Sequence, residues 1–195
     1  THDFDYQGPV VSGATLGTWA YKVGGEARLA AGAIFDGGSH SVDLPFKPRP
    51  DIDELKNELA EWNRCQKEAD AQGDEVAARD YGARAERARR WIGRLENLPE
   101  EGGYAMPFSV YRMGDAVWVS CGGEPYNFLQ TELNRRFPAW TVMVSPLASG
   151  IQVAYLLPEQ RYGKGLYQEE PSLLAPGCLE LLLEAIAAQI EKITV

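Results

Sequence analysis

Residues 119–138 read VSCGGEPYNFLQTELNRRFP, which predicts a strand, a two-glycine turn, a single glutamate and then a helix. Gly122 and Gly123 allow the backbone to turn sharply and let another group approach closely. Pro125 suits the first position of a helix, which places Glu124 beside the helix start. A carboxylate there can simply be stabilised by the helix macrodipole. It can also hold a ligand, because ligands of open α/β sheets gather beyond the carboxyl ends of strands.

This stretch lies inside a longer strand–helix–strand pattern. Residues 116–121 and 141–146 are rich in strand-forming side chains, and the intervening helical segment has apolar residues one turn apart. The spacing is typical of a parallel crossover unit. The preceding strand MPFSVYRM is joined to AVWVSC by Gly114–Asp115, a two-residue hairpin signal.

Further elements are predicted on both sides of this unit. GTWAYKV, ARLAAGAIF and SHSVDLPFKP read as strands separated by turns at Gly24–Gly25 and Gly37–Gly38. IQVAYL reads as one more strand, and a final amphipathic helix starts near Pro176–Gly177. The sequence therefore predicts a single α/β (mixed α+β) domain over residues 1–195, with a mixed sheet and flanking helices.

A strongly charged segment, residues 51–98, interrupts the strand pattern. Apolar residues recur at helical spacing on both sides of Gly73, which predicts an inserted helical hairpin with its turn at that glycine. We call residues 51–98 the hairpin. Each arm has a narrow apolar stripe, so its charges are interpreted mainly as a solvated face, with docking of a partner as the alternative.

Composition restricts the classes of function. The formal net charge of -9 argues against nucleic-acid binding, which needs a basic surface. No run approaches the roughly 18 apolar residues of a membrane span. The three cysteines are widely spaced and are interpreted as small buried hydrophobic residues, and His2 and His40 as incidental. The first residue, Thr1, suggests the C-terminal part of a longer protein.

Several motifs resemble the neutral/alkaline non-lysosomal ceramidase family. That family has a P-G-E turn after a strand, a Y-x-x-Y segment, an E-E-Y…Y-E stretch and a Gly-Pro element before a final helix. Residues 122–124 here read GGE, Tyr155 matches the second tyrosine of Y-x-x-Y, and Tyr162 and Tyr167 match those of E-E-Y and Y-E. Pro176–Gly177 falls at the final element.

The resemblance implies hydrolysis of an N-acyl amide of sphingolipid type, with a zinc ion held by two histidines, a glutamate and a tyrosine. Carried over to this chain, Glu124 and Tyr155 would be the glutamate and tyrosine ligands, and Tyr162 and Tyr167 would contact substrate. Zinc accepts carboxylate oxygen, and a bound cation favours the deprotonated form of its ligands.

Departures from the family pattern limit this expectation. The histidine and serine motifs belong to the N-terminal part of the family's catalytic domain and do not occur here, and Gly122, Gln152 and Gln168 replace family residues. We therefore expect zinc in the full-length parent but none tightly bound here, no activity for this chain alone, and the N-terminal remainder and a lipid amide as partners. The alternative is a non-catalytic binding or structural module derived from that fold.

Overall fold

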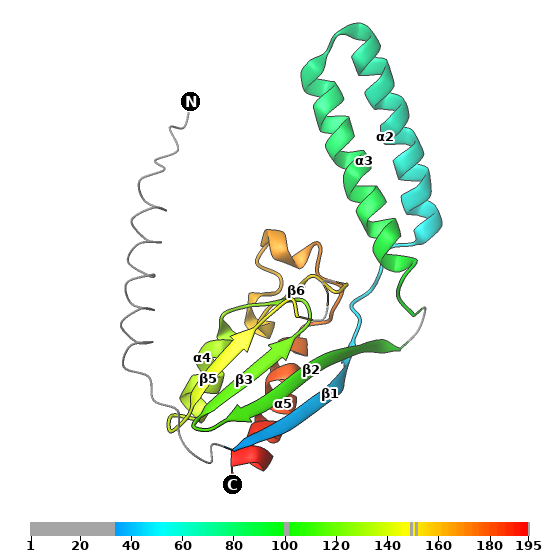
Figure 1. The fold of residues 1–195 in the computed structure, drawn as a ribbon. Helices are drawn as coiled ribbons and strands as arrows, with labels where there is room; N and C mark the ends of the chain where they lie inside the picture. Colours follow the sequence, from blue (N-terminus) through cyan, green and yellow to red (C-terminus); the bar gives the residue numbers. More distant parts are fainter. Residues whose placement is uncertain (1–33, 100–101, 149, 151, 195) are drawn as a thin grey trace, which may run out of the picture. The chain divides into compact units, whose positions relative to one another are not determined.

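A four-stranded sheet organises the chain in the computed structural model, which describes residues 34–99, 102–148, 150 and 152–194. The sheet has the order β1-β2-β3-β5 (Figure 1). Its strands are β1 (Phe35–Pro45), β2 (Gly103–Met113), β3 (Ala116–Cys121) and β5 (Thr141–Ser145). The first three are antiparallel, and β5 runs parallel to β3. The predicted mixed α/β class and the hairpin turn at Gly114–Asp115 are confirmed.

The parallel pair β3–β5 is joined by helix α4 (Phe128–Arg136), as the strand–helix–strand pattern predicted. The expected start of that helix at Pro125 is wrong. Glu124–Pro125 form a two-residue strand, β4, which pairs in parallel with β6 (Tyr155–Leu156). The amide N–H groups of Glu124 and Tyr126 donate to the carbonyls of Ala154 and Leu156, so pairing satisfies these groups where a helix would leave them free.

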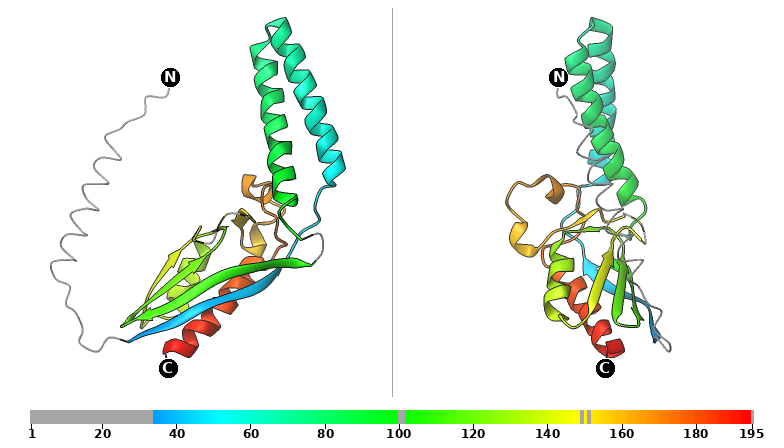
Figure 2. Two further views of the ribbon diagram at one scale, coloured as in Figure 1. Left: turned by 45° about the vertical axis from the view of Figure 1, so that its right-hand side comes forward. Right: turned by 60° about the vertical axis from the view of Figure 1, so that its left-hand side comes forward.

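Helices α4 and α5 (Cys178–Thr194) cover the same face of the sheet (Figure 2). Alternate residues of β2 and β3 point into this layer, and α5 contributes one apolar stripe, as expected from periods of 2 and 3.6. The largest fully buried side chains of this core include Leu44, Met106, Leu129, Leu133, Leu156, Leu179, Leu182, Ile186 and Ile190.

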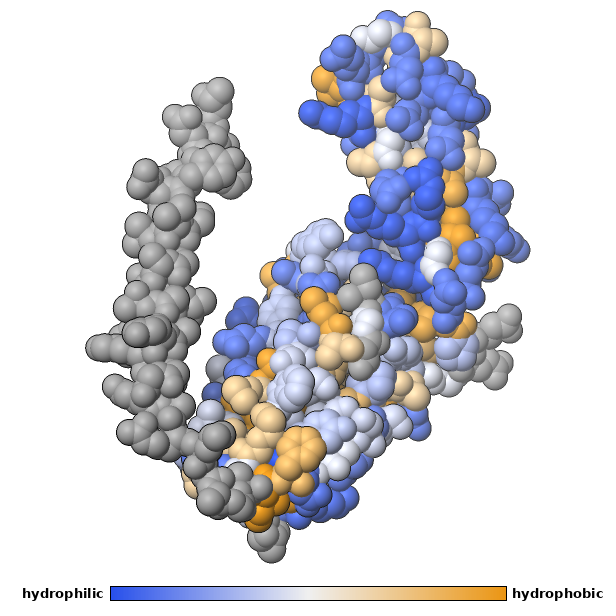
Figure 3. All heavy atoms as spheres, in the orientation of Figure 1, coloured by the Kyte–Doolittle hydropathy of each residue, from blue (hydrophilic) through white to orange (hydrophobic). Residues whose placement is uncertain are grey.

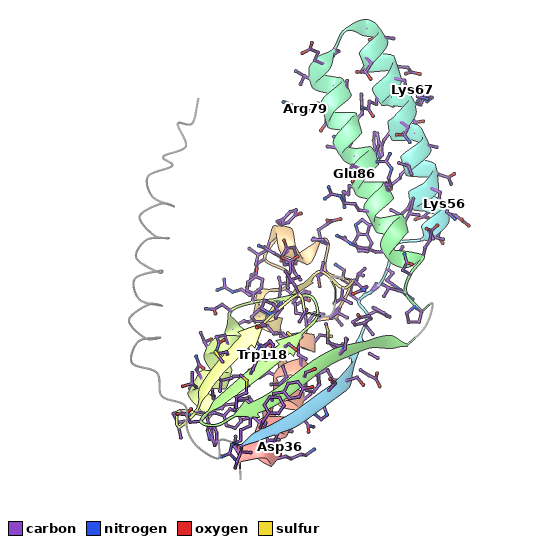
Figure 4. The ribbon with its side chains drawn as sticks, in the orientation of Figure 1. Asp36, Lys56, Lys67, Arg79, Glu86 and Trp118 are labelled. Carbon is purple, nitrogen blue, oxygen red and sulfur yellow. The ribbon has the colours of Figure 1, made fainter. Side chains whose placement is uncertain are left out.

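The other face of the sheet has no helix over it in the described part of the chain. We call it the outer face. Because side chains alternate along a strand, it consists of the odd-numbered residues of β1, β2 and β5 (35–45, 103–113 and 141–145) and the even-numbered residues of β3 (116–120). Asp43 is the one charged residue among them. Phe35 is 71% exposed and Trp118 43% exposed, and Figure 4 shows Trp118 on this face.

The turn predicted at Gly37–Gly38 is wrong, because β1 continues through both residues. Gly37 adopts φ 139°, and a Cβ built there would lie 2.1 Å from the carbonyl oxygen of Val110. The glycine therefore serves close approach of β1 to β2, not a reversal of the chain. A glycine pair alone does not distinguish these two uses.

The hairpin is confirmed, with helices α2 (Ile52–Gln72) and α3 (Glu75–Leu95) joined at Gly73, whose φ is 74°. It is inserted between β1 and β2, which pair with each other along their whole length. Its surface is predominantly hydrophilic (Figure 3). Arg64 pairs with both Glu61 and Glu68 within one helix, and such exposed pairs contribute little to stability.

The described residues belong to one compact unit, Ile34–Val195. The predicted strand GTWAYKV, the Gly24–Gly25 turn and His2 lie outside the described residues, and so does ARLAAGAIF except for its last two residues, of which Phe35 begins β1. Cys121 and Cys178 are buried, as predicted, whereas Cys65 is partly exposed. Among the helices of the described residues, none combines the length and apolarity that crossing a bilayer requires.

Candidate functional site

Strands β4 and β6 bring Glu124 and Tyr155 side by side. The two residues are direct partners in the parallel register, although they are widely separated in the sequence. The pairing is continued by amide-to-carbonyl hydrogen bonds of 2.7 Å from Glu124 to Ala154 and 3.0 Å from Tyr126 to Leu156. Glu124 therefore does not cap α4, whose N-cap residue is Asn127.

The turn before Glu124 depends on Gly123. Its φ is 67°, and a Cβ at this position would lie 2.7 Å from Leu156 Cδ1 and 2.9 Å from the carbonyl oxygen of Ala154. Ala154 itself has a φ of 55°, which a non-glycine residue adopts rarely and at some energetic cost. Strained backbone thus lies directly beside Tyr155, as is common where a side chain must be held in one orientation.

The Glu124 carboxylate acts electrostatically on Tyr155. Its negative charge raises the pKa of the phenol above the ordinary value of 10.0, and a hydrogen bond between the two side chains acts in the same direction. Arg94 opposes this effect but is outweighed. At neutral pH the phenol is therefore protonated and can donate a hydrogen bond to the carboxylate.

Glu124 and Tyr155 line a cavity of about 950 Å³. One wall comes from β4, β6 and the loops next to them, and the opposite wall comes from the last turns of α3 and Asn97. Its described lining residues are Arg90, Gly93, Arg94, Asn97, Glu124, Gly150, Gln152, Ala154, Tyr155, Tyr167 and Pro171. A concave space with a few polar groups directed into it is the usual form of a ligand site.

Tyr167 reaches this cavity from a tightly held loop, residues 163–170. Its ring lies 6.3 Å from that of Tyr155, centroid to centroid, at 69°. Glu169 holds the loop by accepting hydrogen bonds from the amides of Gly163, Lys164 and Leu166. Hydrogen bonding from these backbone groups, that of Leu166 first, lowers the pKa of Glu169 below its ordinary value. The carboxylate is thus stabilised as an anion.

Glu170 fastens the base of the hairpin to the same loop. Its carboxylate accepts hydrogen bonds from Trp91 Nε1 at 2.6 Å and Arg87 Nε at 2.8 Å. Trp91 is buried with Leu55, Ile92 and Leu173 in a small apolar cluster between hairpin and loop. The wall of the cavity formed by α3 is therefore held by both apolar packing and charged hydrogen bonds.

Replacing Glu170 by glutamine should lower the free energy of unfolding by roughly 0.5–1.5 kcal/mol at neutral pH. Burial opposes ionisation of Glu170, but the hydrogen bonds from Trp91 and Arg87 outweigh it and hold its pKa below 4.5. A lowered folded-state pKa stabilises the fold above the unfolded value and loses that effect as pH falls through the folded value. The difference between wild type and variant should therefore shrink at pH below 4.5.

Urea unfolding of residues 1–195 across this pH range measures both effects. The control is Glu191→Gln, which removes an exposed carboxylate of α5. Equal stability of Glu170→Gln and wild type at neutral pH would contradict the anchoring role.

Tyr162, expected at the substrate site, is not among the residues that line this cavity. Its hydroxyl donates to the carbonyl of Leu174 at 3.1 Å and lies 3.4 Å from Ser172 Oγ. Burial raises its pKa. This geometry favours a role in holding the segment that leads into α5.

Sequence reasoning missed the α3 side of the cavity. Arg90 and Arg94 were included in the charges interpreted as a solvated face, yet both line the cavity opposite Tyr155. Arg90 and Arg94 are four residues apart, a spacing that places both on the same face of α3, and this was the signal in the sequence. Only the anchoring by Glu170 and Trp91 shows that this end of the helix faces the site.

In the described ranges, no three side chains among His, Cys, Asp and Glu gather into a metal-binding group. The site therefore offers two oxygen donors, Glu124 and Tyr155, on one wall of an open cavity. No protein-family model matches the chain, and comparisons with curated proteins and with solved structures found no match.

Proposed function

We propose that this chain is the C-terminal part of a ceramidase-like, zinc-dependent amidohydrolase that acts on an N-acyl amide. One observation carries the proposal: Glu124 and Tyr155, which the motifs assign as ligands, are register partners on β4 and β6 and line the same cavity. They were assigned from separate motifs, and the juxtaposition depends on a strand pairing that the motifs do not specify.

The donor set of this pair fits half of a zinc site. Zinc takes carboxylate oxygen and usually needs four ligands, so two further donors are required. In the proposal they are nitrogen donors from the N-terminal remainder of the same protein. Glu124 contributes a carboxylate, and the hydroxyl of Tyr155 interacts with it.

When bound, zinc would supply Lewis-acid polarisation of the amide carbonyl and of water. The residues of this chain would orient the substrate and supply negative charge to the site. Glu124 would be the anionic ligand, and its charge raises the pKa of Tyr155, whereas a bound cation would favour the deprotonated form of that phenol. Tyr167 flanks Tyr155 and adds an exposed aromatic surface suited to an acyl chain.

The outer face of the sheet supports the N-terminal remainder as a partner. Among its residues Asp43 alone is charged, and Phe35, Trp118 and Met143 are exposed. A nearly uncharged face with exposed large apolar side chains can pack against another layer. The incomplete donor set identifies the proposed occupant, because the same remainder must bring the missing ligands.

Turnover of short-chain fluorescent N-acyl amides, both uncharged and negatively charged, tests the proposal, with residues 1–195 and the longer protein assayed side by side. We expect hydrolysis that depends on zinc in the longer protein and no turnover by residues 1–195. Turnover by residues 1–195 alone would contradict the incomplete-site proposal. A longer protein that neither binds zinc nor hydrolyses amides would favour the binding or structural module instead.

A further inference from the structure

Arg90 and Arg94 form a positively charged wall of the cavity, facing the Glu124–Tyr155 pair. Both side chains come from the last turns of α3, and Asn97 continues the same wall one turn further on. The chain has a net charge of -9, yet two arginines line the cavity that contains the proposed ligands. These arginines contribute positive charge in a chain that is negative as a whole. Positive charge within a concavity raises the local concentration of anions.

Neither guanidinium is neutralised across the cavity. Arg90 donates through Nε to Glu86 on its own helix at 3.0 Å, an exposed contact that does not involve its two terminal nitrogens. Arg94 donates to the carbonyl oxygen of Pro171 at 3.5 Å and makes no ion pair with a carboxylate in the described residues. It is partly buried. Arg94 interacts electrostatically with Glu170, but without a direct ion pair its guanidinium keeps N–H donors available for an oxyanion.

The position of this wall is fixed by the contacts at the base of the hairpin. Trp91, between the two arginines in sequence, is 6% exposed and donates to Glu170. The Arg94 guanidinium lies 5.9 Å from the centroid of the Trp91 ring, so the anchored tryptophan holds Arg94 at the edge of the cavity. Rigid donors bind an oxyanion with less loss of conformational entropy than donors on a mobile loop.

We propose that Arg90 and Arg94 recognise an oxyanion, such as a carboxylate, on the amine half of the N-acyl amide substrate. This inference rests on the proposed function and deepens it. The substrate class is an acylated amine that carries a negative charge, as opposed to an uncharged ceramide. The planar forks of the two arginines bind carboxylate, sulfonate or phosphate oxygens, and Tyr167 and Gly93 border the path for the acyl chain.

NMR titration of isotope-labelled residues 1–195 tests this directly, with three probes that share an octanoyl chain. N-octanoylglycine carries an oxyanion beyond the amide, N-octanoylglycinamide is its neutral counterpart, and octanoate carries the oxyanion at the acyl end. We expect N-octanoylglycine to shift the amide signals of Gly93 and Tyr155 and to bind at least about fivefold more tightly than N-octanoylglycinamide.

The variant series is Arg94→Gln, Arg90→Gln and Arg79→Gln. The first two should each weaken N-octanoylglycine about tenfold or more, since each removes a charged hydrogen bond. They should leave N-octanoylglycinamide within about twofold. Arg79→Gln is the matched control, because it removes the same charge near the far end of α3 (Figure 4). Unchanged spectra of the variants outside the site show that they are folded.

Three results would overturn the inference: no shift at Gly93 or Tyr155, equal binding of the charged and neutral amides, or octanoate binding as tightly as N-octanoylglycine. The last would assign the oxyanion to a free fatty acid. Failure of the proposed function is a separate outcome. A longer protein without zinc-dependent hydrolysis, but with the arginine-dependent preference intact, would refute the activity and keep the anion site.

Discussion

Replacing Glu124 by glutamine in the longer protein is expected to lower kcat/KM for N-acyl amide hydrolysis by at least about 100-fold. Mutating a residue that hydrogen-bonds to a metal ligand typically lowers metal affinity or activity about 10–100-fold. Loss of a direct ligand is expected to lower activity more. Glutamine keeps the size and one oxygen but removes the charge that would pair with the cation in the proposed zinc site. The side chain is half-buried, so the free energy of unfolding should change by less than about 1 kcal/mol.

Zinc content and steady-state kinetics of the purified variants measure this effect. Glu159→Gln, an exposed glutamate outside the cavity, serves as the control and should behave as wild type. Tyr155→Phe should also reduce activity, because it removes the phenol oxygen while leaving the ring against Tyr167. Full activity of Glu124→Gln would exclude Glu124 as a zinc ligand.

Replacing Gly123 by alanine is expected to lower the free energy of unfolding by roughly 2–4 kcal/mol and to displace Glu124. The added Cβ would meet Leu156 Cδ1 at 2.7 Å and the backbone oxygen of Ala154 at 2.9 Å. The leucine side chain can rotate, but the backbone oxygen is fixed by the hydrogen bond from Glu124. The expected response is therefore partial separation of β4 from β6.

Gly163→Ala is the matched control for this substitution. Gly163 has a φ of 70°, almost that of Gly123, but nothing lies within 4 Å of a Cβ built there. Its cost should be limited to about 1 kcal/mol of left-handed strain. Urea unfolding of residues 1–195 measures both, and equal losses for the two variants would show that crowding against β6 is unimportant.

Sequence reasoning located most of the elements around the site, because their signals are local. Hydrophobic period, turn residues and the position of Gly73 predicted the hairpin, the β3–α4–β5 unit and α5. The two wrong predictions about backbone conformation involve glycine and proline. Gly37 and Pro125 have the residue types of a turn and a helix start, yet strand pairing with β2 and β6 determines their conformation.

The candidate site was predicted in part. Glu124, Tyr155 and Tyr167 were identified from motifs, and the structure brings all three to one cavity, whereas Tyr162 lies among the residues that hold the segment before α5. The opposite wall was not predicted. A charged helix has the same sequence pattern whether it faces water or a cavity, so Arg90 and Arg94 could not be distinguished from the other arginines of the hairpin.

The sequence by itself determined the mixed α/β class and the inserted hairpin, because periodicity is a property of neighbouring residues, and its motifs indicated Glu124 and Tyr155 as candidate oxygen donors. Tertiary structure alone decided that Glu124 pairs with Tyr155 and that α3 returns to face them. Both depend on contacts between distant segments, the β4–β6 hydrogen bonds and the anchoring of Trp91 on Glu170. Such contacts form only when the fold brings distant segments together. A pattern among neighbouring residues therefore does not predict them.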